Sequence, residues 1–160
     1  MPKRFWGWLA LALAVIALDQ ASKHAIQAAL AYGEVHPVIP GLFNLTLLYN
    51  PGAAFSFLAD AGGWQKHFFT VLALGVSAFL LVQLKRHPEH TRASLAFSLI
   101  MGGALGNVID RLALGHVVDF IQVYYQHWYY PAFNIADSAI CVGAVLMVWD
   151  SLVGRKKEAA

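Results

Sequence analysis

The sequence predicts an all-α membrane protein with four transmembrane helices. Composition is the first reason: 59% of the 160 residues are hydrophobic and only 12% are charged, whereas soluble domains have about 25% charged residues. Four separate apolar stretches are the second reason, since each is close to the roughly 20 residues that cross about 30 Å of hydrocarbon as a helix. Helices are expected because every backbone polar group must be paired inside a bilayer.

The predicted spans belong to one membrane-embedded domain, 1–160, and cover residues 5–29, 67–84, 93–112 and 132–153. A chain of this length is one domain on length alone. The first span also has features of a signal peptide, because Lys3 and Arg4 precede an apolar run with small residues. We favour a retained span, since the run continues through Asp19 and Lys23 with no polar cleavage region before Gly33.

Basic residues are concentrated on one side of the predicted membrane. Eight of the 11 Lys and Arg residues precede the first span, lie between the second and third, or follow the fourth: Lys3, Arg4, Lys85, Arg86, Arg92, Arg155, Lys156 and Lys157. The positive-inside rule then places both termini in the cytoplasm and the longer loops, about 30–66 and 113–131, outside. The net charge of +2 gives no reason to expect nucleic acid, whose binders carry clustered basic faces.

The two predicted outer loops differ in character. In the first, residues 45–49 have the pattern of a short strand, and turn-forming proline, glycine and asparagine residues lie on both sides of it. The second loop is rich in aromatic side chains, which favour the headgroup layer; they are Phe120, Tyr124, Tyr125, Trp128, Tyr129 and Tyr130. We therefore expect a small β element in the first outer loop and an interfacial second outer loop.

Polar residues on three spans are predicted to share one depth near the outer face. With a rise of about 1.5 Å per residue, Asp19, Asn107 and Asp137 all fall roughly 21–22 Å from the inner boundary. Asn134 shares a helical face with Asp137, at i and i+3, and Asp119 can reach the same layer from above the third span. Ionisable groups at such a depth are costly and usually mark function.

Some of these residues also have a structural interpretation. Asp19 and Lys23, at i and i+4, read as a helix pair, and Asp110 with Arg111 as a packing or ion-pair element. We expect Arg111 to join the spans through Asp19 or Asp110.

That leaves Asp119 and Asp137 as carboxylates without an obvious structural partner. Spacing alone does not assign them a role, because His116 and Asp119, at i and i+3, are also possible metal ligands. No third histidine or glutamate lies near them in the sequence, which argues against a metal. The single cysteine, Cys141, excludes an internal disulfide and a thiolate zinc site.

Five short motifs follow one another along the four spans and their loops. They are Asp19-Gln20-x-x-Lys23, Asn50-x-Gly52-Ala53-Ala54-Phe55, Gly102-Gly103-x-x-Gly106-Asn107-x-x-Asp110-Arg111, Val117-Val118-Asp119-Phe120 and Phe133-Asn134-x-Ala136-Asp137. Any one of them is weak, but five in this order on a four-span chain are specific. On these motifs the chain resembles the lipoprotein signal peptidases (signal peptidase II), which are bacterial intramembrane aspartic peptidases.

The resemblance implies a substrate, a site and a location. The substrate would be a prolipoprotein in membrane lipid, cleaved on the amino side of a cysteine that carries a diacylglyceryl group. Asp119 and Asp137 would be catalytic, with neither a metal nor an organic cofactor. The enzyme would act as a monomer in the bacterial cytoplasmic (inner) membrane, with its site near the outer, periplasmic face. The residues that would support the site or contact the substrate are Asp19, Lys23, Asn50, Gly52, Asn107, Arg111 and Asn134.

Two other classes of protein also have apolar spans with buried carboxylates. A small transporter could use Asp19, Asp110 and Asp137 as a proton path, but such a path needs access from both sides. Apart from Asp150 near the inner end of the fourth span, the inner halves of the spans lack charged residues, which argues against one. A non-catalytic membrane scaffold would leave the Asp119 and Asp137 layer unexplained.

Overall fold

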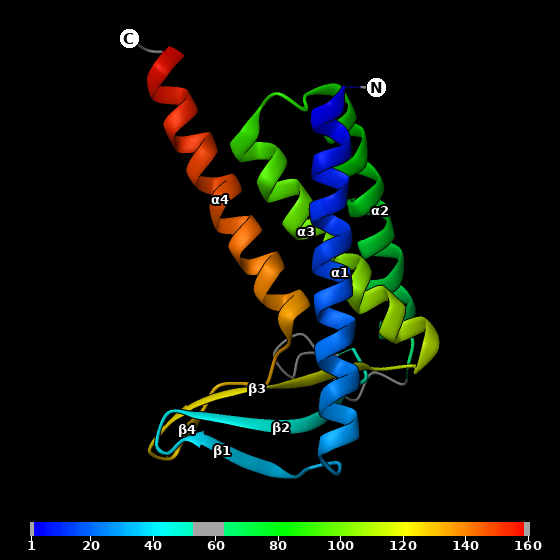
Figure 1. Ribbon diagram of the computed structural model, residues 1–160, viewed down its shortest axis with the longest axis vertical. Helices are drawn as coiled ribbons and strands as arrows, with labels where there is room; N and C mark the ends of the chain where they lie inside the picture. Colours follow the sequence, from blue (N-terminus) through cyan, green and yellow to red (C-terminus); the bar gives the residue numbers. More distant parts are fainter. Residues whose placement is uncertain (1, 53–62, 159–160) are drawn as a thin grey trace.

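The computed structural model describes residues 2–52 and 63–158, with no side chains described from 153 onward (Figure 1). Its four helices are α1 (Lys3–Ala29), α2 (Gln65–Arg86), α3 (Thr91–Ala113) and α4 (Ile135–Glu158). All four are long and apolar enough to cross a membrane. The motif residues Ala53, Ala54 and Phe55 lie outside the described residues.

Helix α3 is the centre of the bundle. It packs against each of the other three helices, and it is the most buried of the four spans. Its glycines allow this close packing: a Cβ on Gly102 would lie 2.8 Å from the carbonyl oxygen of Ala12 in α1, and one on Gly103 would clash with Ala136 in α4. Small residues at helix contacts are the usual way for membrane helices to pack closely.

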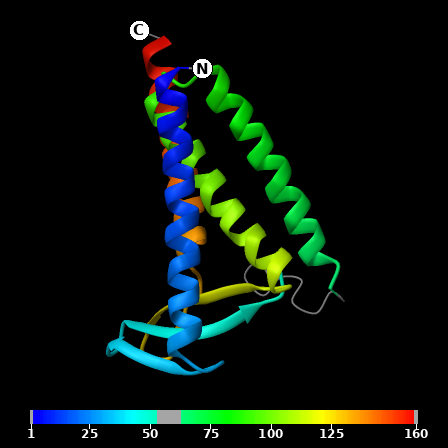
Figure 2. The same cartoon turned by 45° about the vertical axis from the view of Figure 1, so that its right-hand side comes forward.

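A four-stranded antiparallel sheet lies across the end of the bundle that is remote from both termini (Figures 1 and 2). Its order is β1 (Val35–Ile39), β2 (Phe43–Asn50), β3 (Val117–Tyr125) and β4 (Trp128–Tyr129). Strand β2 contains the predicted strand 45–49, so that prediction is confirmed. Its register places Leu48 opposite Asp119 and Asn50 opposite Val117, which brings the first outer loop beside the predicted site.

The second outer loop forms strands, which the sequence analysis did not predict. Strand β3 pairs with both β2 and β4. Its sequence is rich in β-branched and aromatic residues, and such residues favour a pleated, half-buried surface as much as they favour a membrane interface. The composition therefore did not distinguish a strand from an irregular loop, and the pairing with β2 shows that this segment is a strand.

The fourth span begins at Ile135 rather than at 132. Residues 130–133 are extended, and the N–H groups of Tyr130 and Phe133 donate to the carbonyls of Val123 and Ile121 in β3. The helix cannot start until these pairings end. Asp137 therefore lies in the first turn of α4 and not a turn and a half below its start.

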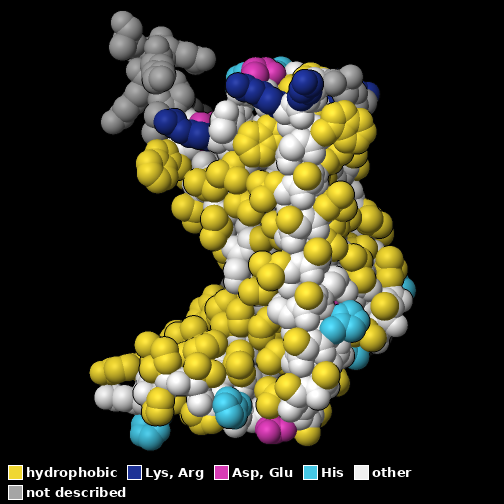
Figure 3. All heavy atoms as spheres, viewed as in Figure 1, with side chains coloured by type: hydrophobic (Ala, Val, Ile, Leu, Met, Phe, Trp, Pro, Cys, Tyr) yellow, Lys and Arg dark blue, Asp and Glu magenta, His cyan; other side chains and the backbone are white. Residues whose placement is uncertain are grey.

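The surface shows where charge and apolar side chains lie. Apolar side chains cover the helices, Lys and Arg gather at the end that holds the N-terminus, and the molecule is hollowed between α4 and the sheet (Figure 3).

Candidate active site

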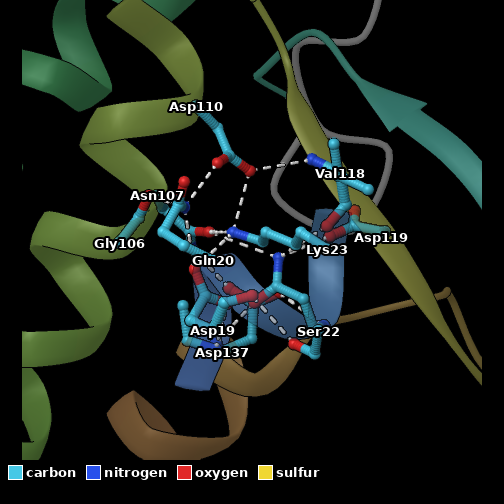
Figure 4. Close-up of polar contacts among 12 residues, drawn as sticks. Asp19, Gln20, Ser22, Lys23, Gly106, Asn107, Asp110, Val118, Asp119 and Asp137 are labelled. Atoms are coloured by element: carbon cyan, nitrogen blue, oxygen red, sulfur yellow. Dashed lines mark hydrogen bonds and ion pairs between the residues drawn. The ribbon is translucent and has the colours of Figure 1, made fainter. Parts of the chain in front are cut away.

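Residues from three of the four helices and from the sheet meet where the bundle joins the sheet. Figure 4 shows the side chains of α1 and α3 pointing toward Asp119 of β3 and Asp137 of α4. The predicted layer of polar residues is thus a set of direct contacts. Its members among the predicted site residues are Asp19, Lys23, Asn50, Asn107, Asp119, Asn134 and Asp137.

Lys23 is the buried cation of this layer. Its side chain is only 1% exposed, and its Nζ lies 2.8 Å from Asp19 Oδ2 and 2.8 Å from Asp110 Oδ2. The same Nζ donates to Asn107 Oδ1 at 2.9 Å. An ammonium group has three N–H donors, so each donor of Lys23 has a partner, which a charge buried this deeply requires.

The two aspartates that pair with Lys23 also hold the backbone next to the other two. Asp110 Oδ2 accepts from the N–H of Val118 at 3.1 Å, and Asp19 Oδ1 accepts from the N–H of Ala136 at 2.9 Å. Val118 precedes Asp119 in the chain, and Ala136 precedes Asp137. The ion-paired aspartates therefore fix the peptide units from which Asp119 and Asp137 project.

Asn134 and Asp137 form a capping box at the start of α4. The Oδ1 of Asn134 accepts from the N–H of Asp137 at 2.9 Å, and the Oδ2 of Asp137 accepts from the N–H of Asn134 at 3.3 Å. This reciprocal pair satisfies two backbone donors at a helix N-terminus. It also fixes the side chain of Asp137, because one carboxylate oxygen is held by the cap.

Three asparagine side chains are aimed at the two carboxylates. Asn107 Nδ2 donates to Asp137 Oδ1 at 2.8 Å, while Asn134 and Asn50 donate to Asp119 at 2.8 and 3.2 Å. In each case the amide oxygen accepts from a group that can only donate. The three donors are Lys23 Nζ, the N–H of Asp137 and the N–H of Gly52. The NH₂ group of each amide must therefore face a carboxylate.

Gly52 is placed at its position by sterics. Its φ is +116°, and a Cβ there would lie 2.9 Å from Gln65 Cγ. Any other residue would strain the backbone and move the N–H that holds Asn50. This is a physical reason for glycine at a predicted site position.

Asp119 and Asp137 line the same cavity of about 780 Å³. Asp119 is 4% exposed. Burial, and then the negative charge of Asp137, raise the pKa of Asp119 from its ordinary value of 3.8 to about 7, although the amides of Asn50 and Asn134 and the charge of Lys23 oppose the shift. A carboxyl group with such a pKa can exchange a proton near neutral pH, as acid–base catalysis requires.

The expected role of Arg111 in joining the spans is wrong, because Lys23 makes both of those ion pairs. The guanidinium of Arg111 instead lies 5.6 Å from the ring centroid of Phe69, and its Nη1 donates to the carbonyl of Asn107 at 3.4 Å. Its Nε is buried without a hydrogen-bond partner among the described residues, and the side chain lines the cavity. The side chain of Arg111 is therefore part of the cavity wall.

Two further outcomes concern residues around the site. The ring of His116 lies 4.2 Å from that of Tyr49, and in the described parts of the chain no cluster of three metal-ligating side chains contains His116 or Asp119. The sequence analysis missed Gln20, whose Nε2 donates to Asp110 Oδ1 at 2.7 Å. Its place beside Asp19 in the first motif was the available signal.

Four apolar helices, with the buried Asp119 and the half-buried Asp137 lining one cavity, fit the class of membrane-embedded aspartic peptidases. The sequence profile described as "Signal peptidase (SPase) II" matches residues 11–153. The chain belongs to the signal peptidase II family. Membership of a peptidase family argues against the two other interpretations of the sequence, a small transporter and a non-catalytic scaffold.

Individual relatives agree with the profile. The chain is 62% identical to the lipoprotein signal peptidase of Chromobacterium violaceum over 91% of this chain and 90% of that one. It is 59% identical to the one from Neisseria meningitidis serogroup B, over 97% and 92%. Among solved structures, a bacterial membrane enzyme is similar with a TM-score of 0.83 and 32% identity, over 94% of this chain and 90% of that one.

Proposed function

We propose that Asp119 and Asp137 are the catalytic pair with which this family member removes signal peptides from prolipoproteins. The proposal rests on one arrangement: both carboxylates line one cavity, are bridged by Asn134, and contact neutral donors rather than a cation. Two neighbouring carboxyl groups that share one proton are the working form of an aspartic peptidase.

The reaction needs no covalent intermediate. The ionised carboxylate takes a proton from water as the water oxygen bonds to the scissile carbonyl carbon, and the protonated carboxyl group gives its proton to the carbonyl oxygen. The tetrahedral diol then collapses. The C–N bond breaks, a carboxyl group supplies the proton that the leaving amine takes, and a hydroxyl proton returns to the pair. The products are a free amine on the cysteine and a carboxyl terminus on the signal peptide.

The two aspartates have different surroundings. Asp137 lies in the first turn of α4, where the helix N-terminus favours negative charge. Asp119 lies on a strand and has its pKa raised to about 7. Titration is a property of the pair, so Asp119 and Asp137 share one proton and neither residue is assigned a fixed role.

The other predicted residues have distinct tasks. Lys23 and Asn107 orient Asp137, while Asn50 and Asn134 orient Asp119. Arg111, whose side chain lines the cavity, donates to a carbonyl of the substrate backbone.

The proposed orientation places the sheet outside the bacterial inner membrane and both termini in the cytoplasm. Lys and Arg lie at the end of the bundle opposite the sheet (Figure 3), in accord with the positive-inside rule. Exposed aromatic side chains of β3 and β4, including Tyr125, Trp128 and Tyr129, suit the outer headgroup layer. The catalytic cavity then lies near the outer face, where a lipid-anchored peptide bond would be.

Lipid on the substrate sets the depth of the bond. Each buried CH₂ contributes about 0.8 kcal/mol of membrane binding, so two acyl chains hold the cysteine at the level of the cavity. We expect the purified enzyme to cleave a diacylglyceryl-modified prolipoprotein peptide orders of magnitude faster than the same peptide without lipid. Mass spectrometry of the products reads both the cut position and the rate. Equal cleavage of the two peptides would overturn the assignment of a lipoprotein substrate.

A further inference from the structure

The turn between α2 and α3 brings two imidazoles and a carboxylate together at the end of the bundle remote from the catalytic cavity. His87 Nδ1 lies 3.8 Å from Glu89 Oε1, and His90 Nε2 lies 3.5 Å from the same oxygen. The three ligand atoms all lie within 4.8 Å of one another. All three side chains are more than half exposed, so they can be reached from solvent and can adjust their rotamers.

The backbone of this turn is held at both ends and in the middle. The N–H of His87 donates to the carbonyl of Gln83 at 2.9 Å, and the N–H of Ser94 donates to that of His90 at 2.8 Å. The indole N–H of Trp8 in α1 donates to the carbonyl of Pro88 at 2.9 Å. A tethered turn presents its side chains with little backbone entropy left to lose on binding.

We propose that His87, Glu89 and His90 form a binding site for a late first-row divalent metal ion such as Zn²⁺ or Ni²⁺. Two ligands bonded to one tetrahedral zinc at about 2.1 Å are about 3.4 Å apart. The two carboxylate–imidazole separations, 3.5 and 3.8 Å, are already close to this value. Small side-chain rotations bring the second imidazole in, and water completes the coordination.

The surrounding charges decide which metals fit. Lys85 and Arg86 lie in the last turn of α2, and Arg92 follows Thr91 at the start of α3. These three cations outnumber Glu89 and Asp150, which lines a pocket with His90 and Arg92. The positive balance opposes ions that bind by charge, such as Mg²⁺ and Ca²⁺, which also require oxygen ligands. Imidazole coordination is then the main source of affinity, and imidazole suits zinc, copper and nickel.

The consequence of binding is local to the turn. A metal there joins the end of α2 to the start of α3, on the loop where Trp8 attaches α1. It binds the folded chain in preference to the unfolded one, and so raises the unfolding temperature. The metal takes no part in peptide cleavage, which is carried out at the other end of the bundle.

Calorimetric titration of the full chain in detergent, with any purification tag removed, tests the site. We expect Zn²⁺ to bind with a stoichiometry of one, micromolar affinity and a rise in the unfolding temperature, while Mg²⁺ has no effect. His87→Ala and His90→Ala should each weaken Zn²⁺ binding at least tenfold without changing cleavage. His127→Ala, which removes an exposed histidine between β3 and β4, is the matched control and should bind as the wild type does.

A second probe keeps the test decisive if an alanine variant unfolds. Cu²⁺ bound to the wild type should show hyperfine coupling to two imidazole nitrogens in its EPR spectrum, and His90→Gln should show one. Absence of one-site zinc binding to the wild type, or binding unchanged in both histidine variants, would refute the proposal. Neither result bears on Asp119 or Asp137.

Discussion

Two pairs of aspartates lie at the same end of the bundle, and they differ in what contacts them. Asp19 and Asp110 share the ammonium group of Lys23. Asp119 and Asp137 accept only from asparagine amides and a backbone N–H, with no ion pair within 4.0 Å in the part of the chain that the structure describes. A contacting cation favours the charged form of a carboxylate. Asp119 has no such contact among the described residues, and burial and the charge of Asp137 raise its pKa. Burial alone does not separate the ion-paired aspartates from the pair that we propose to be catalytic, but a contacting cation does.

The largest effect on activity should come from substituting Asp119 or Asp137, the two aspartates that asparagine amides contact. Asp119→Asn and Asp137→Asn each remove the exchangeable proton, so we expect each to lower turnover at least a thousandfold. The unfolding temperature should change little, because no buried ion pair is lost. Asp150→Asn makes the same chemical change farther along α4 and should retain activity. Substantial residual cleavage by either site variant would remove that residue from the chemistry.

Removing the cation that Asp19 and Asp110 share should instead lower the stability of the fold. Lys23→Met leaves Asp19 and Asp110 buried without their cation, and losing one partner of a buried pair costs about 3–5 kcal/mol. Adding Asp110→Asn removes one of the stranded charges and should recover part of the loss. Denaturant unfolding in detergent measures both effects. A stable but inactive Lys23→Met protein would mean that Lys23 supports activity, by holding Asn107 against Asp137, more than it supports the fold.

Asn134 makes both a structural contact and a contact to the proposed catalytic pair, because it caps α4 and also donates to Asp119. Asn134→Ser keeps an oxygen that can cap the helix but loses the donor. Asn134→Ala loses both, and a lost cap costs about 1 kcal/mol. We expect the serine variant to unfold near the wild-type temperature with cleavage reduced roughly tenfold, and the alanine variant to be impaired in both measurements. Equal activity of the serine variant and the wild type would show that the amide of Asn134 does not orient Asp119.

The raised pKa of Asp119 predicts that the rate of cleavage depends on pH. Because its folded pKa is about 7, against an ordinary value of 3.8, the working proton leaves the pair as pH rises through about 7, and cleavage should decline above it. At low pH the base is protonated, so cleavage should fall there too. A rate that keeps rising at high pH would contradict this account.

The same shift has a consequence for folding. A raised carboxyl pKa means that the folded state holds the proton more tightly than the unfolded state does. The contribution of Asp119 to stability is therefore complete below about pH 4 and is lost as pH rises through about 7. Unfolding measured across this range should show a decline that Asp119→Asn abolishes. An unchanged slope in the variant would assign the decline to another group.

The four spans were predictable because the length of an apolar run can be read directly from the sequence. The sheet was not fully predictable, because the pairing of strands joins residues that are far apart in the chain. Strand β2 could be read from its turn residues, but β3 depends on a partner about seventy residues earlier in the chain. The same limit explains why the prediction for Arg111 was wrong. The sequence shows two cations near one depth, Lys23 and Arg111, and only the packing of the helices decides which of them reaches Asp19 and Asp110.

The assignment of Asp119 and Asp137 as the proposed catalytic pair came from family motifs more than from physics. Spacing placed Asp137 near Asn134, but the hydrogen bonds from Asp110 to Val118 and from Asp19 to Ala136 span distant segments. Nothing local in the sequence signals such contacts. Helix rise placed Asp19, Asn107 and Asp137 at similar levels, and Asn107 does contact Asp137, although the fourth span begins three residues later than predicted.

The smallest expected effect is that of Cys141 on catalysis, and it serves to locate the cavity. Cys141 is the only cysteine, lies one turn beyond Asp137, is exposed and lines the cavity without contacting either carboxylate pair. Cys141→Ala should therefore keep at least half of the wild-type rate. A bulky maleimide on the wild-type thiol should block the cavity and abolish cleavage, and bound substrate peptide should slow the labelling. The alanine variant should resist the reagent. Full activity of the labelled wild-type enzyme would show that the peptide reaches Asp119 and Asp137 by a route that does not pass this wall of α4.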